Sequence, residues 1–422
     1  MNNHRESDSA LGRYRVLDLT DGGCMLGGRM LGDLGADVIK IEPPQGSLSR
    51  IGPFYKDITE PEKSLFWFAY NTNKRGITLD ITQSEGQKVF KELVKTVDIV
   101  MESYEPGYMS SLKLGYSYLC EIKPDIIFTS ISPFGQSGPK AHYKESELTS
   151  WASGGYLYLC GNPDRAPTWI GFPQAFLHGG AEAAVGTMTA LWHRQGTGEG
   201  QQVDVSIQEC IMSSDMNALH MWDVNGVDFC RYSGWQLVPS TGVRLQNGYR
   251  CKDGDVILHI MGGSETSSAS MRRLVAWMEE EGMADDWLKQ IDWMIEYNAS
   301  ILTQDMVDKV ESAVAKFALT KTKAELYEEG AIKRRIILAP VCNTRDICEN
   351  PQLRFRNYWV KVLHPESGEA LTYCGPFARL SETPIVYRRR APLIGEHNED
   401  VYVKELGLSA ENLTSLKQAG VI

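Results

Sequence analysis

Residues 15–42, RVLDLTDGGCMLGGRMLGDLGADVIKIE, place two apolar runs on either side of a helix-like segment. RVLDL (15–19) is a short apolar run that ends in a glycine-rich turn, a pattern typical of a buried strand. MLGGRMLGDLGA follows as a helix closed by Gly35, and DVIKIE (37–42) is a second strand. Two strands joined in this way predict a right-handed βαβ unit with parallel strands.

The same alternation of strand and helix signals continues to residue 220. DIVMES (98–103) and PDIIFTSI (124–131) are further strands, separated by a predicted helix over 108–121. The segment TQSEGQKVFKELVKTVD places five apolar side chains on one helical face: Val89, Phe90, Leu93, Val94 and Val97. Repeated units of this kind predict an α/β fold, in which helices cover both faces of a parallel sheet.

The regular alternation of strand and helix patterns ends past residue 225. NGYRCKDGDVILHIMGG (247–263) predicts a small hairpin with KDGD at its turn. Residues 265–330 have mostly helical patterns, short strands return over 335–394, and the C-terminus predicts two short helices, the second starting at Ser409. The pattern indicates a large α/β domain that is interrupted or followed by a smaller one.

Length and composition narrow the classes of protein. The 422 residues exceed the length at which single cores stop growing, about 250–300 residues, so two domains are expected. The net charge of −11 argues against nucleic acid or an anionic membrane as the main partner. The sequence begins without an apolar leader, and its nine scattered cysteines never form Cys-x-x-Cys. We therefore expect a cytoplasmic protein with reduced thiols and no metal site.

The first glycine-rich turn, DLTDGGCMLGG, raises the question of a dinucleotide site, with Glu42 where a ribose-binding acid would lie. The dinucleotide pattern Gly-x-Gly-x-x-Gly is not matched by the four glycines of this turn. A tight turn with close helix packing explains them better, and a nicotinamide oxidoreductase is only a weak alternative.

Basic residues lie where a parallel sheet collects ligands. Lys74 and Arg75 precede a strand, and Lys140 lies in a loop after the strand PDIIFTSI. Ligands bind at the carboxyl ends of such strands, where lysine and arginine could contact a phosphate. Each residue could equally be an ordinary surface charge. From the residues alone, the prediction is an α/β enzyme that binds an anionic ligand.

Several recognisable segments follow one another along nearly the whole chain: VLDLT, LGDLGADVIKIEPPQG, NTNKRGITLDI, DIVMESYEPG, SISPFGQSGP, TGEGQQVDVSIQE and APLIGEHNEDVYVKELGLS. In this order they resemble the class III CoA-transferases, also called the CaiB/BaiF type. The resemblance implies a Rossmann-like large domain formed by both chain ends, a small middle domain and an interlocked dimer. It assigns residues 1–225 to the large domain, 226–330 to the small domain, and 331–422 to a part that returns to the large domain.

The resemblance also implies where the catalytic residue should be. Transferases of the family use an aspartate nucleophile in a pattern close to Gly-x-Pro-x-x-Asp-Leu-x-x-Gly. Here IGFPQAFLHGG (170–180) matches that pattern without a gap, ahead of a predicted buried helix. The aspartate position is occupied by Phe176, flanked by Gly171, Pro173, Leu177 and Gly180. A phenyl ring cannot form an acyl anhydride, so no catalytic residue of the usual kind is expected in this chain.

Other residues could substitute for the aspartate. His178 and Glu182 are four residues apart and would share a helical face. Glu182 would lie roughly 9 Å deeper along the helix axis than Phe176, too far for a thioester bound in the family manner. Local packing roles for both residues are favoured, and Glu145 and Glu147 are further outside candidates. The histidine–aspartate chemistry of the family's racemases is disfavoured by the same missing aspartate.

The resemblance implies CoA, carried as an acyl-CoA substrate, as the bound group. Family members hold its adenine with backbone groups at positions that match Thr78, Leu79, Ser103 and Tyr104. The phosphate-binding residues match less well, because two usual arginines are replaced by Pro43 or Pro44 and by Ser111. Lys113 and Lys140 are the remaining candidates for phosphate contacts.

Together these features predict the aspartate-lacking subunit of a heteromeric transferase, paired with a paralogous chain that carries the aspartate. Such an enzyme would move CoA between an acyl-CoA and a carboxylic acid. Family members that act on benzylsuccinate are built in this way from two different subunits, which suggests succinyl-CoA and an aryl-succinate. The alternatives are a homodimeric transferase or isomerase that uses another residue, and a non-catalytic acyl-CoA-binding protein.

Overall fold

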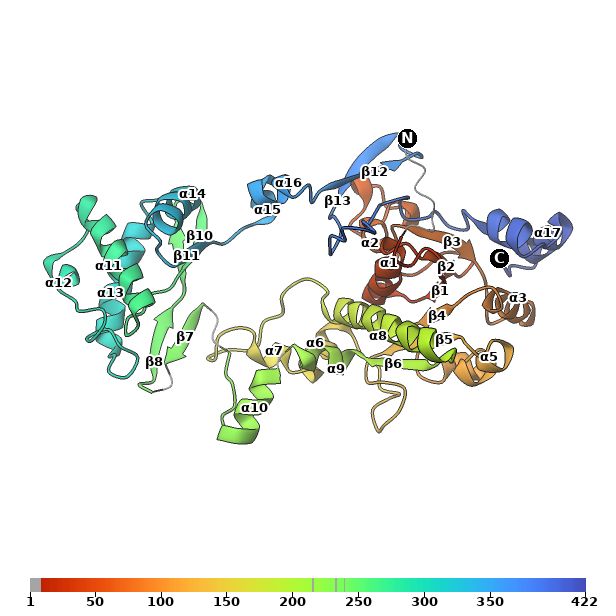
Figure 1. Ribbon diagram of the computed structural model, residues 1–422, viewed down its shortest axis with the longest axis horizontal. Helices are drawn as coiled ribbons and strands as arrows, with labels where there is room; N and C mark the ends of the chain where they lie inside the picture. Colours follow the sequence, from red (N-terminus) through yellow and green to blue (C-terminus); the bar gives the residue numbers. More distant parts are fainter. Residues whose placement is uncertain (1–8, 215, 232–233, 239) are drawn as a thin grey trace. The chain divides into compact units, whose positions relative to one another are not determined.

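The computed structural model describes residues 9–214, 216–231, 234–238 and 240–422. The chain forms two compact units, drawn in Figure 1. The first unit contains residues 1–158, 169–229 and 354–422, and the second contains residues 159–168 and 230–353. Each unit is described by itself.

The first unit is built on a sheet of six parallel strands in the order β3-β2-β1-β4-β5-β6. The strands are β1 (Arg15–Leu19), β2 (Asp37–Glu42), β3 (Lys74–Thr78), β4 (Ile99–Glu102), β5 (Ile127–Ser132) and β6 (Gln202–Ser206). This sheet confirms the predicted α/β class. The strand order reverses between β1 and β4, and ligands bind at such a switch point in open parallel sheets.

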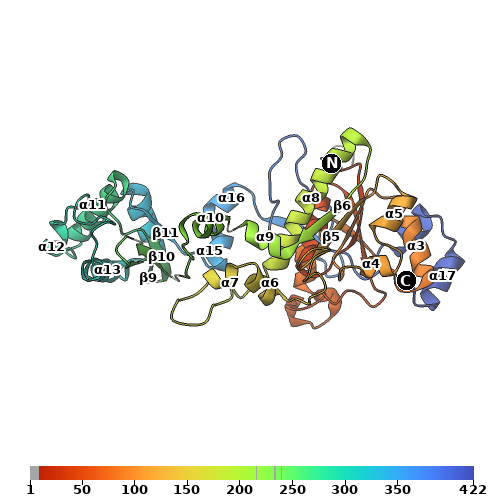
Figure 2. The ribbon, with the colours of Figure 1, turned by 90° about the horizontal axis from the view of Figure 1, so that it is seen from below.

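Successive residues of each strand pack on opposite faces of the sheet. Val16 and Val38 contact the layer that contains α1 (Met25–Asp33) and α8 (Ala175–Thr197). Leu17 and Ile39 contact the layer of α3 (Ser84–Val94), α5 (Tyr116–Ile122) and α17 (Ala410–Gln418). Figure 2 shows α8 on one side of the sheet and α3, α5 and α17 on the other. Because both faces are covered, almost every residue of β1 to β5 is buried, including polar side chains such as Asp18 and Lys74.

Helices α1 and α8 approach each other closely through glycine. A Cβ atom on Gly27 would lie 2.7 Å from the Gly180 carbonyl oxygen, and one on Gly180 would lie 2.9 Å from the Gly23 carbonyl oxygen. Neither position has room for a larger residue. Gly23 and Gly27 therefore serve close packing against α8, the role favoured over nucleotide binding.

The C-terminal segment packs back onto the sheet. Asn398 Oδ1 accepts a hydrogen bond from the Thr78 N–H at 2.9 Å, and Tyr402 donates its hydroxyl to the Thr78 carbonyl at 2.7 Å. The two predicted short helices are present at Glu399–Glu405 and in α17, where the Ser409 hydroxyl accepts a hydrogen bond from the Asn412 N–H. This segment covers the carboxyl end of β3.

The prediction of a single helix over 108–121 is wrong in one respect, because this range forms two helices. They are α4 (Tyr108–Ser111) and α5. Lys113, between them, has a left-handed φ of 57°, which ends the first helix. The short strands predicted over 335–394 are β11 (Leu338–Pro340), β12 (Val360–His364) and β13 (Glu369–Tyr373). Two helices in that range were not predicted, namely α15 (Thr344–Glu349) and α16 (Pro351–Phe355).

The remaining helical segments of the first unit are short. They are the single turns η2 (Gly22–Cys24), η3 (Tyr55–Asp57) and η4 (Pro61–Lys63), and the helices α2 (Leu65–Tyr70), α6 (Glu147–Ser153), α7 (Tyr156–Leu159), α9 (Ile207–Ser213) and α10 (Met216–Asn225). The turn η2 and helix α6 contribute to the site described below.

The second unit packs a small antiparallel sheet against helices. Strands β9 (Gly248–Cys251) and β10 (Gly254–Leu258) form the predicted hairpin, with β11 on the other edge of β10. Its remaining elements are β7 (Trp235–Val238), β8 (Val243–Gln246), α11 (Glu265–Glu280), α12 (Asp286–Lys289), α13 (Gln304–Ala318), α14 (Lys323–Glu325) and the helical segment η5 (Leu326–Lys333). Its core joins α11 to α13 through Trp277 and Phe317, whose ring centroids lie 4.9 Å apart.

Candidate functional site

A cavity of 360 Å³ lies at the switch point of the sheet. Its walls come from the turns after β1 and β4, the loop after β5 and the first turn of α8. The lining residues used below are Asp21, Cys24, Ser49, Ser103, Tyr104, Glu105, His142, Lys144, Glu145 and Phe176. The predicted nucleophile position and part of the predicted CoA site therefore share one cavity.

Hydrogen bonds join the turns that form this cavity. The Asp21 N–H donates to Ser103 Oγ at 2.8 Å, and the Gly22 N–H donates to Ser49 Oγ at 2.8 Å. The Ser47 hydroxyl donates to Asp21 Oδ1 at 2.7 Å. The ends of β1, β2 and β4 are thus connected before any ligand arrives, which lowers the entropy cost of binding.

Glu42, the residue considered as a ribose-binding acid, is used inside the protein. Arg50 donates to both Glu42 carboxylate oxygens at 2.7 Å, and both side chains are almost fully buried. The guanidinium of Arg50 also lies 3.9 Å from the centre of the Trp67 ring. A carboxylate held by a bidentate ion pair is not free to bind a ribose. Glu42 therefore cannot serve as the ribose-binding acid that a nicotinamide oxidoreductase would need.

Phe176 is half-buried in the first turn of α8 and packs against the apolar layer that includes Cys24 and Ile207. A Cβ atom on Gly23 would lie 2.8 Å from Phe176 Cβ, so helix and turn are in tight contact here. Burial raises the pKa of the neighbouring Cys24 thiol, so that side chain is protonated at neutral pH. Neither residue offers a nucleophile.

The N-terminus of α8 is capped by a carboxylate from another helix. Glu147 Oε1 accepts hydrogen bonds from the N–H groups of Gln174 and Ala175, and Oε2 accepts one from Phe176 at 3.3 Å. The Trp151 indole N–H also donates to Glu147 Oε1, at 3.0 Å. The amides at which a helix would bind an anion are therefore occupied by the protein itself. Glu147 stabilises the helix and is not free for nucleophilic attack.

Replacing Glu147 by alanine is expected to lower the free energy of unfolding by about 2 kcal/mol, because a charged cap is lost from a long helix. Amide hydrogen exchange of residues 174–178 is the direct measurement and should accelerate. Glu147→Gln is the matched control, since it keeps one acceptor oxygen and should lose less stability. Unchanged exchange in Glu147→Ala would show that the carboxylate is not the cap.

Glu145 is the carboxylate that does line the cavity with Phe176. Its Oε1 accepts a hydrogen bond from the Ser153 hydroxyl at 2.7 Å. Its Oε2 is buried and has no hydrogen-bond partner among the described residues. Burial raises the pKa of Glu145. His178 and Glu182, the other candidates, are absent from the cavity lining, and Glu182 is exposed on the outer face of α8.

The residues predicted to bind CoA divide into three groups. Ser103 and Tyr104 line the cavity. Thr78 and Leu79 are buried at the end of β3, where their N–H groups donate to Asn398 Oδ1 and to the Glu42 carbonyl. Lys113 and Lys140 are exposed and do not line the cavity.

Two basic residues that sequence reasoning missed line this cavity: His142 and Lys144. The available signal was their position in the loop after β5, only a few residues beyond Lys140. Each can offer N–H groups to an anionic ligand. They are therefore better placed than Lys140 to bind a phosphate or carboxylate.

The prediction that Lys74 and Arg75 contact a phosphate is wrong. Lys74 is fully buried and donates to Asp18 Oδ2 at 2.7 Å and to Asn71 Oδ1 at 2.9 Å. Arg75 donates to Asp37 and Glu405. Burial lowers the pKa of Lys74 to about 8, against the opposing effect of Asp18. Both cations stabilise the fold because internal carboxylates face them.

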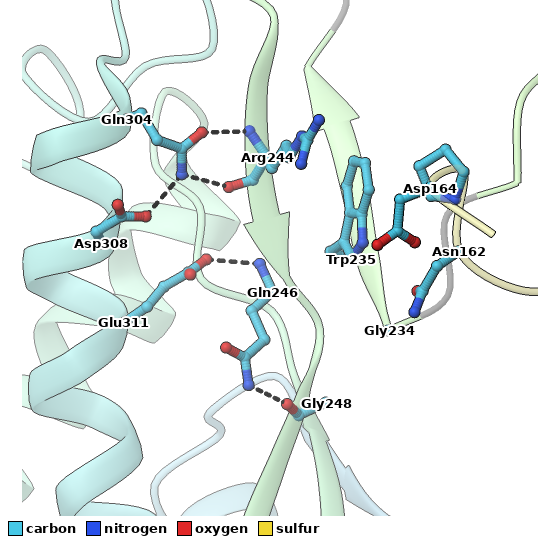
Figure 3. Close-up of a pocket in the computed structure, with 11 residues that line it drawn as sticks. Asn162, Asp164, Gly234, Trp235, Arg244, Gln246, Gly248, Gln304, Asp308 and Glu311 are labelled. Carbon is cyan, nitrogen blue, oxygen red and sulfur yellow. Dashed lines mark hydrogen bonds between the residues drawn. The ribbon is translucent and has the colours of Figure 1, made fainter.

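A larger cavity of 850 Å³ lies within the second unit (Figure 3). Two side chains of α13 close the edge of β8 there: Gln304 Oε1 accepts from the Arg244 N–H at 2.9 Å, and Glu311 Oε1 from the Gln246 N–H at 2.6 Å. Burial raises the pKa of Glu311 to about 7. The polar groups here cover a strand edge, and none of the predicted site residues is present.

No group of three or more histidine, cysteine, aspartate or glutamate side chains is arranged to hold a metal ion in the part of the chain that the structure describes. None of the helices within the described ranges is long and apolar enough to cross a membrane.

The fold is that of an α/β protein with a cavity at the switch point of a parallel sheet, the place where such sheets bind ligands. The family model "CoA-transferase family III" matches residues 11–398, and the chain belongs to that family. It is 34% identical over 412 residues to the succinyl-CoA:(R)-benzylsuccinate CoA-transferase subunit BbsE of Thauera aromatica, covering 97% of each chain.

Two further comparisons agree with this assignment. The chain is 30% identical to the formyl-CoA:oxalate CoA-transferase of Streptomyces coelicolor, covering 98% of this chain and 99% of the relative. A crystal structure of a CaiB/BaiF family protein from Brucella suis has a similar fold, with a TM-score of 0.80 and 24% identity. That match covers 94% of this chain and 99% of the other.

Proposed function

We propose that this chain is the subunit of a heteromeric family III CoA-transferase that lacks the usual nucleophile. The complex would move CoA between an acyl-CoA and a carboxylic acid. The observation that carries the proposal is Phe176, which stands in the first turn of α8 and lines the cavity at the switch point. An aspartate there would attack the thioester, and phenylalanine has no atom that can do so.

The surface of the first unit supports assembly with another chain. Val185, Met188 and Trp192 follow one another at helical spacing on α8, and Trp192 is 78% exposed. Leu219 and Trp222 of α10 are also exposed, at 56% and 61%. Large exposed apolar side chains grouped on helices are typical of protein interfaces. A paralogous chain that carries the aspartate is the partner that would make such a complex catalytic.

The relative from Thauera aromatica suggests the substrates. Its name assigns it to the transfer of CoA from succinyl-CoA to (R)-benzylsuccinate, as a subunit. Tyr104, Tyr143 and Phe176 line the cavity of the present chain and offer aromatic surface to an aryl group. We therefore infer an aryl-succinate or a similar acid as the acceptor and succinyl-CoA as the donor.

The test is to purify the chain alone and together with an aspartate-bearing paralogue from the same genome. CoA transfer from succinyl-CoA to benzylsuccinate is then followed by chromatography. We expect no turnover by the single chain, a stable hetero-oligomer on co-expression, and turnover by that complex. Turnover by the purified single chain, or a preference for homodimers when both chains are made together, would contradict the proposal.

A second candidate function rests on Glu145. A buried carboxylate oxygen without a partner, in the same cavity as Phe176, is suited to act as an alternative nucleophile or base. In that case the chain alone would be active as a homodimer, and Glu145→Gln would abolish the activity. A CoA adduct trapped on Glu145 and located by mass spectrometry would decide for this candidate.

A further inference from the structure

Glu102 lies between two cavities of the first unit. It is the last residue of β4, it is 3% exposed, and its Oε2 accepts a hydrogen bond from the Tyr104 N–H at 2.7 Å. This bond closes the turn that presents Ser103 and Tyr104 to the 360 Å³ cavity. Ser103 in turn accepts the hydrogen bond from Asp21 that joins the β4 turn to the β1 turn. One carboxyl thus determines the shape of the cavity wall.

On its other side Glu102 faces a polar cavity of 130 Å³. Glu105, Tyr116, Ser130, Gln136 and Gln202 also line it. The side-chain nitrogen Nε2 of Gln136 is buried and has no hydrogen-bond partner among the described residues. The cavity has room for about four water molecules, at about 30 Å³ each, and enough polar groups to bind them. A proton can therefore reach or leave the Glu102 carboxyl from this side.

The surroundings of Glu102 disfavour the charged, carboxylate form of its side chain. Burial raises its pKa to about 7, against the opposing effects of the Ser130 hydroxyl and the Tyr104 N–H. The neighbouring Asp204 on β6 also raises the pKa. Glu105, Tyr104, Tyr116 and Cys24 are further titratable groups near it, and the cation Lys144 is paired with Glu105 at 3.8 Å. Glu102 is thus set to change charge near neutral pH.

We infer that Glu102 is a positioning residue for the acyl-CoA cavity, which holds the Ser103–Tyr104 turn more firmly as a carboxylate than as a neutral acid. The inference rests on the proposed function, which supplies acyl-CoA as the ligand of this cavity. A hydrogen bond to a charged acceptor is roughly twice as strong as one to a neutral acceptor. Binding of CoA should therefore tighten as the pH rises from 6 to 8, by up to about tenfold, which corresponds to 1.4 kcal/mol.

The experiment compares the wild type with Glu102→Gln and Glu102→Ala in the assembled complex. Affinity for CoA is measured by calorimetry at pH 6 and pH 8, and exchange of the Tyr104 amide is followed by mass spectrometry. Glu102→Gln keeps a neutral acceptor, so it should match the wild type at pH 6 and show a smaller pH dependence than the wild type, namely the part that comes from the titration of CoA itself. Glu102→Ala should expose the Tyr104 amide and raise the KM for acyl-CoA by about tenfold, with a much smaller change in kcat.

The outcomes separate the two proposals. Equal pH dependence in the wild type and Glu102→Gln would overturn the inference, since CoA itself titrates in this range and would then explain all of it. Unchanged Tyr104 exchange in Glu102→Ala would overturn it as well. A wild-type complex that does not bind CoA would refute the proposed function. The exchange of Tyr104 at pH 6 and pH 8 would then still decide whether Glu102 holds the turn.

Discussion

Phe176→Asp is expected to give no CoA-transferase activity in the purified single chain, although it recreates the aspartate of the family pattern. The new carboxylate would enter an apolar layer and would lie beside Glu147, which already accepts hydrogen bonds from the amides of this helix turn. Burial and a second negative charge both raise the pKa of a carboxyl group and weaken it as a nucleophile. If the family's arginines are replaced at Pro43 or Pro44 and at Ser111, as the resemblance implies, CoA would also be less well placed.

In the proposed complex the same substitution should leave most of the activity, because the proposal assigns the chemistry to the aspartate of the partner. Replacing that aspartate by alanine should lower kcat by at least about 1,000-fold, or about 4 kcal/mol in the activation free energy. Both changes are measured as transfer from succinyl-CoA to benzylsuccinate, with a search for a covalent CoA adduct. Phe176→Leu is the control for a change of shape without charge.

Two results would contradict this view of Phe176. Robust turnover by the single chain carrying Phe176→Asp would show that the cavity has kept a complete catalytic site. The second result is a complex that loses its activity with a correctly folded Phe176→Asp subunit but keeps it with Phe176→Leu. That outcome would show that the apolar surface takes part in the working site.

Asp18→Ala is expected to destabilise the protein by about 3–5 kcal/mol, because it leaves two buried ammonium groups without their shared counter-charge. Asp18 is fully buried, and Lys74 and Lys40 lie 2.7 Å and 3.7 Å from its carboxylate oxygens. Burial alone would raise the pKa of Asp18, but the two lysines lower it below its ordinary value. The carboxylate therefore remains charged and compensates both cations.

Urea unfolding, followed separately by far-ultraviolet circular dichroism and by tryptophan fluorescence, measures this effect. Glu85→Ala is the matched control, because Glu85 and Lys88 form an ion pair at 2.6 Å on the surface. Surface pairs contribute about 0–1 kcal/mol, so the control should remain close to the wild type. A loss below about 1 kcal/mol in Asp18→Ala would mean that the buried lysines find other partners or lose their protons.

The predictions that succeeded depend on neighbours in the chain. Alternating strand and helix signals sufficed for the parallel sheet, because apolar periodicity reports which face of each element is buried. The hairpin around KDGD and the helix start at Ser409 follow from turn and cap chemistry over a few residues. The alignment of Phe176 with the aspartate of the family pattern also comes from residue order alone, and it stays a prediction.

The predictions that failed concern charged groups and their distant partners. Lys74 has the sequence context of a ligand-binding lysine, and only the folded chain brings Asp18, 56 residues away, against it. Glu147 was a candidate nucleophile until α6 placed it on the N-terminus of α8. The sequence by itself determined most of the elements and the sheet class, because these depend on local periodicity and residue identity. The tertiary structure alone decided which charges are compensated, because the free energy of a buried charge depends on groups within a few ångströms in space and not along the chain.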